Sequence, residues 1–190
     1  FYREKGDYAK AEPMYQRSLR ILEKAEGAKH TNYAAGLNNL ANLYRDKGDY
    51  DKAEPLYERA LALKERALGA DHQDVARYRD NLAFLYYSKG EYAKAEPLYL
   101  SALATWEKSL GPNHPMLGRT LSNLAKLYFV LKDYRRAEPL YQRALAIFET
   151  AFGPKHYFLA SILRGLAKTA MAEAKYAQAV AYLARANAIH

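Results

Sequence analysis

Apolar side chains recur along this chain at the spacing of an α-helix. Leu40, Ala41 and Tyr44 share one helical face, and Ala53 and Tyr57 begin a similar face after a short turn. The residues between them are mostly Glu, Lys, Arg and further Ala and Leu, all of which favour helices. Because no stretch alternates as a half-buried strand must, a β-propeller is excluded. The pattern predicts an all-α chain built from pairs of helices.

These helices repeat at an interval of 42 residues. Three sequence blocks keep the same register, which chance does not explain. Gly-Asp-Tyr or a close variant stands at 6–8, 48–50 and 90–92; Ala-Glu-Pro-Leu-Tyr stands at 53–57, 95–99 and 137–141; and a Leu-Ala-x-Leu-Tyr block ends at Tyr44, Tyr86 and Tyr128. One repeat therefore contains one pair of helices.

The period and the helix-ending residues together predict where each helix begins and ends. Gly48 and Gly90 end the first helix of a pair, and Asp49 or Glu91 then caps the second. Gly27, Gly69, Gly111 and Gly153 follow the second helices, and Pro115 begins a first helix. First helices are predicted at 31–47, 73–89, 115–131 and 157–173, and second helices at 8–26, 50–68, 92–110, 134–152 and 176–189.

The arrangement of small and large residues resembles the tetratricopeptide repeat, in a form eight residues longer than the usual 34. With the joint Gly111-Pro112-Asn113-His114-Pro115, it is similar to the repeats of kinesin light chains and their bacterial relatives. The resemblance implies a right-handed superhelical solenoid of about 4.5 repeats, with first helices lining its inner face. HEAT and armadillo repeats have a similar length but lack the alanine pattern.

We expect one solenoid over residues 1–190. Its units are 1–30 (partial), 31–72, 73–114, 115–156 and 157–190. Residues 1–5 match the tail of a first helix, so the chain is expected to be a fragment of a longer protein. The resemblance weakens in the last unit, where Gly165 replaces the asparagine of earlier units.

Composition argues against catalysis and against a bound cofactor or metal. The chain contains no cysteine, so disulfides and thiolate chemistry are excluded, and a reducing cytoplasm is the expected location. No apolar run is long enough to span a membrane, and no signal peptide is evident. His30, His72, His114 and His156 recur once per joint. We expect them to cap or pack against the following helix rather than to converge on a metal.

The net charge of +8 favours acidic partners. By resemblance, the inner face carries the first-helix residues that lie just outside the Leu-Ala-Tyr core. This set includes Asn38, Asp80 and Ser122. The residues expected to bind peptide are Asn39, Arg77, Asn81, Phe84, Tyr87, Arg119, Asn123, Lys126, Phe129, Arg164 and Lys168.

These residues predict a groove for an extended, acidic peptide with a bulky apolar anchor. The asparagines at 39, 81 and 123 offer both a donor and an acceptor to a peptide backbone, as the resemblance implies. The basic residues would orient the peptide, and the aromatic residues would form pockets. The alternative is local: the asparagines and aromatic residues pack against neighbouring helices, and the charges form an ordinary solvated surface.

Two other classes of function stay open. The end helices, with Leu183, Ala184 and Ala188 at one end and Phe1 and Tyr2 at the other, could support self-assembly. The groove could also hold a segment of the same full-length protein as a regulatory contact. Nucleic-acid binding is less favoured, because acidic and basic residues are mixed in most charged runs.

Overall fold

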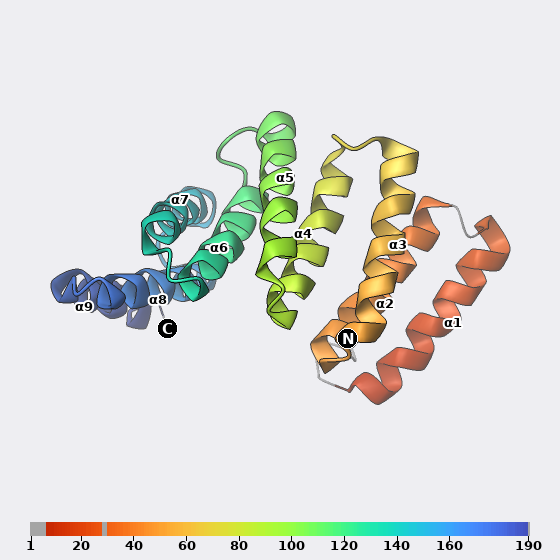
Figure 1. Ribbon diagram of the computed structural model, residues 1–190, viewed down its shortest axis with the longest axis horizontal. Helices are drawn as coiled ribbons and strands as arrows, with labels where there is room; N and C mark the ends of the chain where they lie inside the picture. Colours follow the sequence, from red (N-terminus) through yellow and green to blue (C-terminus); the bar gives the residue numbers. More distant parts are fainter. Residues whose placement is uncertain (1–6, 28–29, 190) are drawn as a thin grey trace. The chain divides into compact units, whose positions relative to one another are not determined.

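The computed structural model describes residues 7–27 and 30–189, and every regular element within them is an α-helix (Figure 1). The helices are α1 (Tyr8–Glu26), α2 (Thr31–Lys47), α3 (Tyr50–Leu68), α4 (Gln73–Lys89), α5 (Tyr92–Leu110), α6 (Pro115–Val130), α7 (Tyr134–Phe152), α8 (Tyr157–Ala172) and α9 (Tyr176–Asn187). The predicted helices are confirmed, with ends that differ by at most two residues. The expected helix tail at 1–5 and the end surface at Phe1 and Tyr2 lie outside the described residues.

The chain divides into two compact units, residues 1–105 and 106–190. The first unit holds α1 to α4 and most of α5, and the second holds the end of α5 and α6 to α9. Within each unit, consecutive helices lie side by side and run in opposite directions, so each unit is a stack of antiparallel helix pairs (Figure 1). A single array over 1–190 with period-defined units stays a prediction.

The core of each unit combines alanines with large side chains. In the first unit Ala41, Ala53 and Ala60 are fully buried, and Tyr57 is 1% exposed. The alanines let neighbouring helices approach closely, and the tyrosine fills the space beside them. Tyr141 has the same position in the second unit and is 2% exposed. Burying one such large side chain contributes about 1.5–3 kcal/mol.

The first helices end in left-handed residues. Gly48 and Gly90 have φ values of 83° and 79° at the ends of α2 and α4, as the sequence predicts. At the same repeat position in the second unit, Lys132 and Ala174 have φ values of 60° and 59°. A side chain there crowds the following carbonyl, so these two residues are conformationally strained.

Histidines cap the first helices. The Nδ1 atoms of His30, His72, His114 and His156 each accept a hydrogen bond from the backbone N–H two residues later, at 3.0 to 3.4 Å. This confirms the expected capping role. Such a bond satisfies one of the N–H groups left without a partner in the first helical turn.

The predicted cap at Asp49 is wrong. Asp7 and Asp133 accept a hydrogen bond from the backbone N–H three residues later, at 3.3 and 3.1 Å. Asp49 occupies the same position before α3 but makes no such bond. Its carboxylate instead lies 3.4 Å from the ammonium of Lys47 and 3.8 Å from that of Lys52.

Among the helices of the described residues, none combines the length and the hydropathy that a membrane span requires.

Candidate functional site

The predicted groove residues of the first unit lie on α2 and α4. Asn39 is exposed, whereas Arg77, Asn81, Phe84 and Tyr87 are half-buried. The amide of Asn81 donates a hydrogen bond to Oδ1 of Asn38 on α2, at 3.0 Å. Asn81 therefore also joins the neighbouring first helices α2 and α4 in this unit.

Three residues that the sequence placed on the inner face are buried. Asn38 and Asp80 are each 2% exposed, and Ser122 is 6% exposed. They share one repeat position, directly before the asparagine series. Because a helix turns by about 100° per residue, that single step moves a side chain from the accessible face to the packed face. Asn38 is an example, because its side chain is buried between helices and its Oδ1 accepts the hydrogen bond from the amide of Asn81.

Phe84 and Tyr87 belong to a row of neighbouring side chains in the first unit, of which only these two rings are stacked. The guanidinium carbon of Arg45 lies 5.0 Å from the ring centre of Phe84. The ring of Phe84 is 6.1 Å from that of Tyr87, which in turn is 5.8 Å from that of Tyr92. Burial raises the pKa of the Tyr87 hydroxyl. These side chains therefore support one another across α2, α4 and the start of α5.

The charge of Arg77 is partly neutralised within the first unit. Its guanidinium lies 3.4 Å from a carboxylate oxygen of Asp74, and its central carbon lies 4.9 Å from the ring centre of Tyr78. Asp74 also lies 3.8 Å from the ammonium of Lys64. Two cations, Arg77 and Lys64, therefore share one carboxylate in this part of the first unit.

The second unit contains a pocket of about 420 Å³ between α6, α7 and α8. Its apolar wall comes from all three helices and consists of Pro115, Met116, Phe148, Phe152, Phe158 and Ile162. Its polar lining consists of Arg119, Ser122, Asn123, Lys126 and Ser161. This volume falls within the range of small-molecule binding sites.

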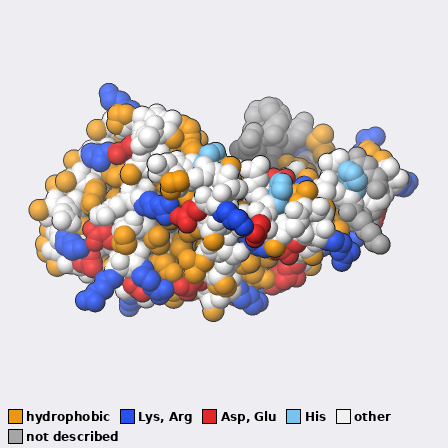
Figure 2. All heavy atoms as spheres, turned by 90° about the horizontal axis from the view of Figure 1, so that it is seen from above, with side chains coloured by type: hydrophobic (Ala, Val, Ile, Leu, Met, Phe, Trp, Pro, Cys, Tyr) orange, Lys and Arg blue, Asp and Glu red, His pale blue; other side chains and the backbone are white. Residues whose placement is uncertain are grey.

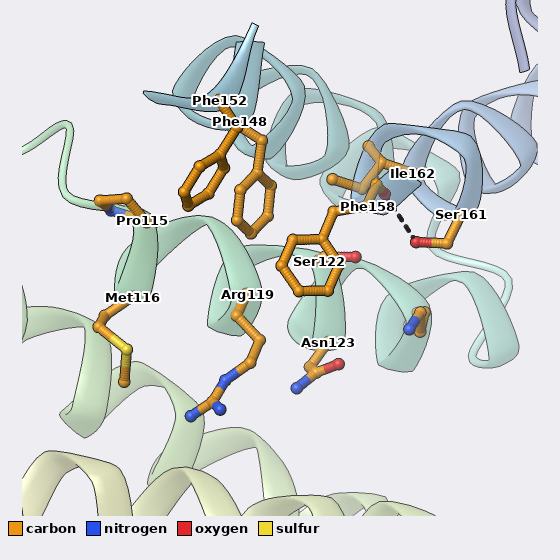
Figure 3. A pocket seen from close by; sticks show the side chains of 11 residues that line it. Pro115, Met116, Arg119, Ser122, Asn123, Phe148, Phe152, Phe158, Ser161 and Ile162 are labelled. Atoms are coloured by element: carbon orange, nitrogen blue, oxygen red, sulfur yellow. Dashed lines mark hydrogen bonds between the residues drawn. The ribbon is translucent and has the colours of Figure 1, made fainter. Parts of the chain in front are cut away.

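Three phenylalanine rings form the back of this pocket. The ring centre of Phe148 lies 5.8 Å from that of Phe152 and 5.4 Å from that of Phe158. Phe148 is buried, but Phe152 and Phe158 remain 45% and 40% exposed. In Figure 3, Arg119 and Asn123 extend from α6 in roughly the same direction, away from the rings of Phe148 and Phe152. The pocket is thus aromatic on one side and polar on the other.

Lys126 carries a charge that no described residue compensates. No carboxylate of the described part of the chain lies within ion-pair distance of its ammonium, which is half-buried in the pocket lining. Burial lowers the pKa of Lys126, and no opposing interaction raises it. A half-buried cation without a partner is unfavourable unless something else supplies a negative charge.

The corresponding contact in the first unit has the opposite chemistry. Counting back two repeats, Phe148 and Phe158 correspond to Lys64 and Asp74, which form the ion pair at 3.8 Å. Lys126 corresponds to Asn42, whose Oδ1 accepts a 2.6 Å hydrogen bond from the hydroxyl of Tyr57. At these three positions the first unit pairs its polar groups with one another or with Tyr57, whereas the second unit exposes rings beside an unpaired cation.

The remaining predicted residues lie apart from the pocket lining. Arg164 and Lys168 are exposed on α8, and the ring of Phe129 packs against that of Tyr134 at 5.6 Å. Of the predicted groove residues, the pocket brings together Arg119, Asn123 and Lys126. All three come from α6.

The sequence prediction missed the aromatic wall, because it included only the first-helix positions just outside the Leu-Ala-Tyr core. Phe148 and Phe152 lie on the second helix α7, and Phe158 lies in the first turn of α8. A signal was present in the repeat comparison. Where Phe148 and Phe158 stand, an earlier repeat has Lys64 and Asp74, so both positions change from charged to aromatic.

Among the described residues, no group of three or more His, Asp or Glu side chains could hold a metal ion. Figure 2 shows Lys and Arg side chains scattered among acidic and apolar ones on the face in view, rather than gathered in one patch. This distribution differs from the continuous basic stripe typical of nucleic-acid-binding surfaces.

The fold of both units defines a class of protein, the helical-repeat scaffolds. The sequence model of the tetratricopeptide repeat matches residues 1–66, 33–104, 74–150 and 117–189, which together span nearly the whole chain. The chain therefore belongs to the tetratricopeptide repeat family. No curated protein sequence matches the chain.

Solved structures show the same fold. The crystal structure of BtubC (BKLC) from P. vanneervenii is 27% identical with a TM-score of 0.86, covering 99% of this chain and 75% of that one. The TPR-like repeats of a putative kinesin light chain from Podosopora anserina are 23% identical, with a TM-score of 0.80 and coverage of 99% and 89%. The apo form of RapI is 20% identical with a TM-score of 0.77, covering 99% of this chain and 50% of that one. The fold is that of kinesin-light-chain-type repeats, and such repeats act as protein-protein interaction scaffolds.

Proposed function

We propose that this scaffold binds an extended, acidic peptide segment along its first helices. The observation that carries the proposal is the charge of α6 and α8. Neither helix contains an acidic residue, whereas Arg119, Lys126, Arg164 and Lys168 supply four positive charges. Three of these side chains are exposed and the fourth, Lys126, is half-buried.

Polar and apolar groups near these charges suit a peptide. Asn123 lies in the pocket lining with its amide accessible to a backbone, and the exposed rings of Phe152 and Phe158 can receive an apolar anchor. Charge would orient the peptide, and the anchor would supply affinity. A location in the cytoplasm, compatible with the absence of cysteine, is part of the same proposal.

Fluorescence anisotropy with labelled acidic peptides containing one aromatic residue tests this function. Reversing two charges with Arg164→Glu and Lys168→Glu should weaken binding by tenfold or more. Arg66→Glu is the control for charge reversal, since Arg66 is exposed on the second helix α3 and is not among the predicted groove residues. Equal affinity in the double variant and the wild type would contradict the proposal.

Self-association through α9 is a second candidate that one observation favours. Leu183 is 39% exposed, although the tyrosines at the same repeat position, Tyr57, Tyr99 and Tyr141, are at most 2% exposed. Tyr176 and Val180, on the same side of α9, are each 66% exposed. Sedimentation at two protein concentrations would detect the dimer, and Leu183→Glu should abolish it. A single monomeric mass at both concentrations would eliminate this candidate.

A further inference from the structure

The pocket of the second unit combines exposed aromatic rings with a half-buried cation that has no anionic partner among the described residues. Its aromatic wall keeps much of the surface of Phe152 and Phe158 in solvent, at 45% and 40% exposure. Beside that wall lies the half-buried ammonium of Lys126, with no anionic partner in the described part of the chain. The first feature attracts an apolar ring, and the second attracts a negative charge.

The first unit shows that the repeat can satisfy these positions by itself. Lys64 and Asp74 pair with each other where Phe148 and Phe158 stand, and Asn42 is hydrogen-bonded where Lys126 stands. The fold therefore does not require an unpaired cation beside exposed rings. The difference between the units points to a ligand that supplies both the missing charge and the missing apolar contact.

We propose that the pocket between α6, α7 and α8 binds a small aromatic carboxylic acid. The ring of the ligand lies against Phe148, Phe152 and Phe158, and its carboxylate pairs with the ammonium of Lys126. The amide of Asn123, which lines the polar side three residues before Lys126 on α6, is a further donor for the carboxylate.

Size and charge both support this class of ligand. A volume of about 420 Å³ holds a two-ring molecule, and the pocket is formed entirely by residues of the second unit. Burial lowers the pKa of Lys126. A bound carboxylate would raise that pKa toward its ordinary value, and the same ion pair would strengthen the binding of the carboxylate. The inference goes beyond peptide binding, because it requires neither an extended chain nor the charges of Arg164 and Lys168.

Isothermal titration calorimetry of the full chain with 2-naphthoate tests the inference. Two related compounds separate the contributions: 2-naphthamide has the same rings without the charge, and acetate has the charge without the rings. We expect saturable binding of 2-naphthoate, at least tenfold weaker binding of 2-naphthamide, and no measurable binding of acetate.

Variants place the binding in the pocket. Lys126→Met keeps an unbranched side chain of similar length without the charge and should weaken binding of 2-naphthoate at least tenfold. Lys168→Met is the matched control, because Lys168 holds the same repeat position one unit later and does not line the pocket. Phe158→Ser removes a ring that is already 40% exposed, so the fold should persist while binding is lost.

The inference is overturned by absence of saturable binding, by equal affinity for 2-naphthamide, or by equal losses in the Lys126 and Lys168 variants. Circular dichroism of each variant excludes unfolding as the cause of a loss. Failure of acidic peptides to bind would not affect this result, since no peptide is present in the titration.

Discussion

At the scale of single residues, the clearest departure from the repeat is the replacement of glycine at the ends of α6 and α8. Lys132 and Ala174 adopt the left-handed conformation that Gly48 and Gly90 adopt in the first unit. A non-glycine residue pays about 1–2 kcal/mol for that conformation, whereas glycine costs more entropy on folding, by about 0.4–1 kcal/mol. Because the strain of a non-glycine residue exceeds the extra entropy cost of glycine, glycine is the more stable residue at both sites.

Lys132→Gly and Ala174→Gly should therefore each raise the free energy of unfolding, by about 0.5–1 kcal/mol. Urea unfolding followed by circular dichroism measures the change. Gly48→Ala is the reverse experiment and should lower stability by a similar amount or more. A loss of stability in both glycine variants would show that the left-handed residues are not strained.

A second residue-scale prediction concerns the pH dependence caused by Lys126. Because burial lowers the pKa of its ammonium below the ordinary 10.5, the folded state binds this proton less tightly than the unfolded chain does. The destabilisation of the folded state by Lys126 is fully present at neutral pH, where its ammonium is charged in both the folded and the unfolded chain. It is relieved as the pH rises through the lowered pKa toward the ordinary value.

Lys126→Met should therefore be more stable than the wild type at pH 7, and the difference should shrink as the pH approaches 10.5. Thermal unfolding of Lys126→Met and of the wild type between pH 7 and about 10.5 measures this difference in stability. Lys168→Met, at an exposed position, should show no such trend. A stability difference that stays constant with pH would argue that the charge of Lys126 is not the cause.

At the scale of helices, close packing explains why the last repeat departs from the asparagine series. Gly165 takes the place of Asn39, Asn81 and Asn123, and a Cβ atom at Gly165 would lie 2.6 Å from the ring of Tyr141. Tyr141 is 2% exposed and cannot move aside easily. The glycine therefore lets α8 approach α7.

Restoring the repeat residue with Gly165→Asn should destabilise the protein, by about 1–3 kcal/mol, through overpacking. Comparison of repeats alone would suggest the opposite effect. Chemical unfolding gives the value, and a double-mutant cycle with Tyr141→Leu should recover part of the loss, because the two residues are in contact. Ser161→Asn, on an exposed part of the same helix, should change stability little.

Helix caps at equivalent positions also differ in ways that can be measured. Asp133 caps α7 through the N–H of Arg136, whereas Asp49 makes no cap before α3. Asp133→Ala should therefore cost about 1 kcal/mol of stability, and Asp49→Ala distinctly less. Equal costs in urea unfolding would show that ion pairs rather than the cap dominate at both positions.

At the scale of the whole molecule, the net charge of +8 should affect the binding of an acidic peptide more than the binding of 2-naphthoate. Exposed charges such as Arg164 and Lys168 are screened by salt over a Debye length of about 10 Å at 0.1 M and about 3 Å at 1 M. A half-buried charge such as Lys126 is screened much less.

Raising the salt concentration should therefore weaken acidic-peptide binding steeply, while the affinity for 2-naphthoate should change by a smaller factor. Anisotropy and calorimetry over the same salt series make the comparison. The peptide affinity of the Arg164→Glu and Lys168→Glu double variant should depend less on salt. Equal salt dependence of the peptide and 2-naphthoate would contradict this division.

The sequence by itself determined the helices and the repeat. The 3.6-residue periodicity, the glycines and the histidine caps are local properties, so the predicted helix ends agree with the observed ones to within two residues. Membership of the tetratricopeptide repeat family follows from the same pattern. From the family resemblance, the sequence also predicted Arg119, Asn123 and Lys126 as peptide-binding residues. These three residues line the pocket, and their role in binding a peptide stays a prediction.

Only the tertiary structure decided which of those side chains are accessible and what lies beside them. Asn38, Asp80 and Ser122 are buried because one residue of helical rotation separates the packed face from the accessible one. One pocket is lined by Lys126 together with Phe148, Phe152 and Phe158, because three helices converge there. Residues from different helices come together through packing rather than through spacing in the chain. A repeat fixes where helices begin, but the contacts between neighbouring helices give each pocket its chemistry.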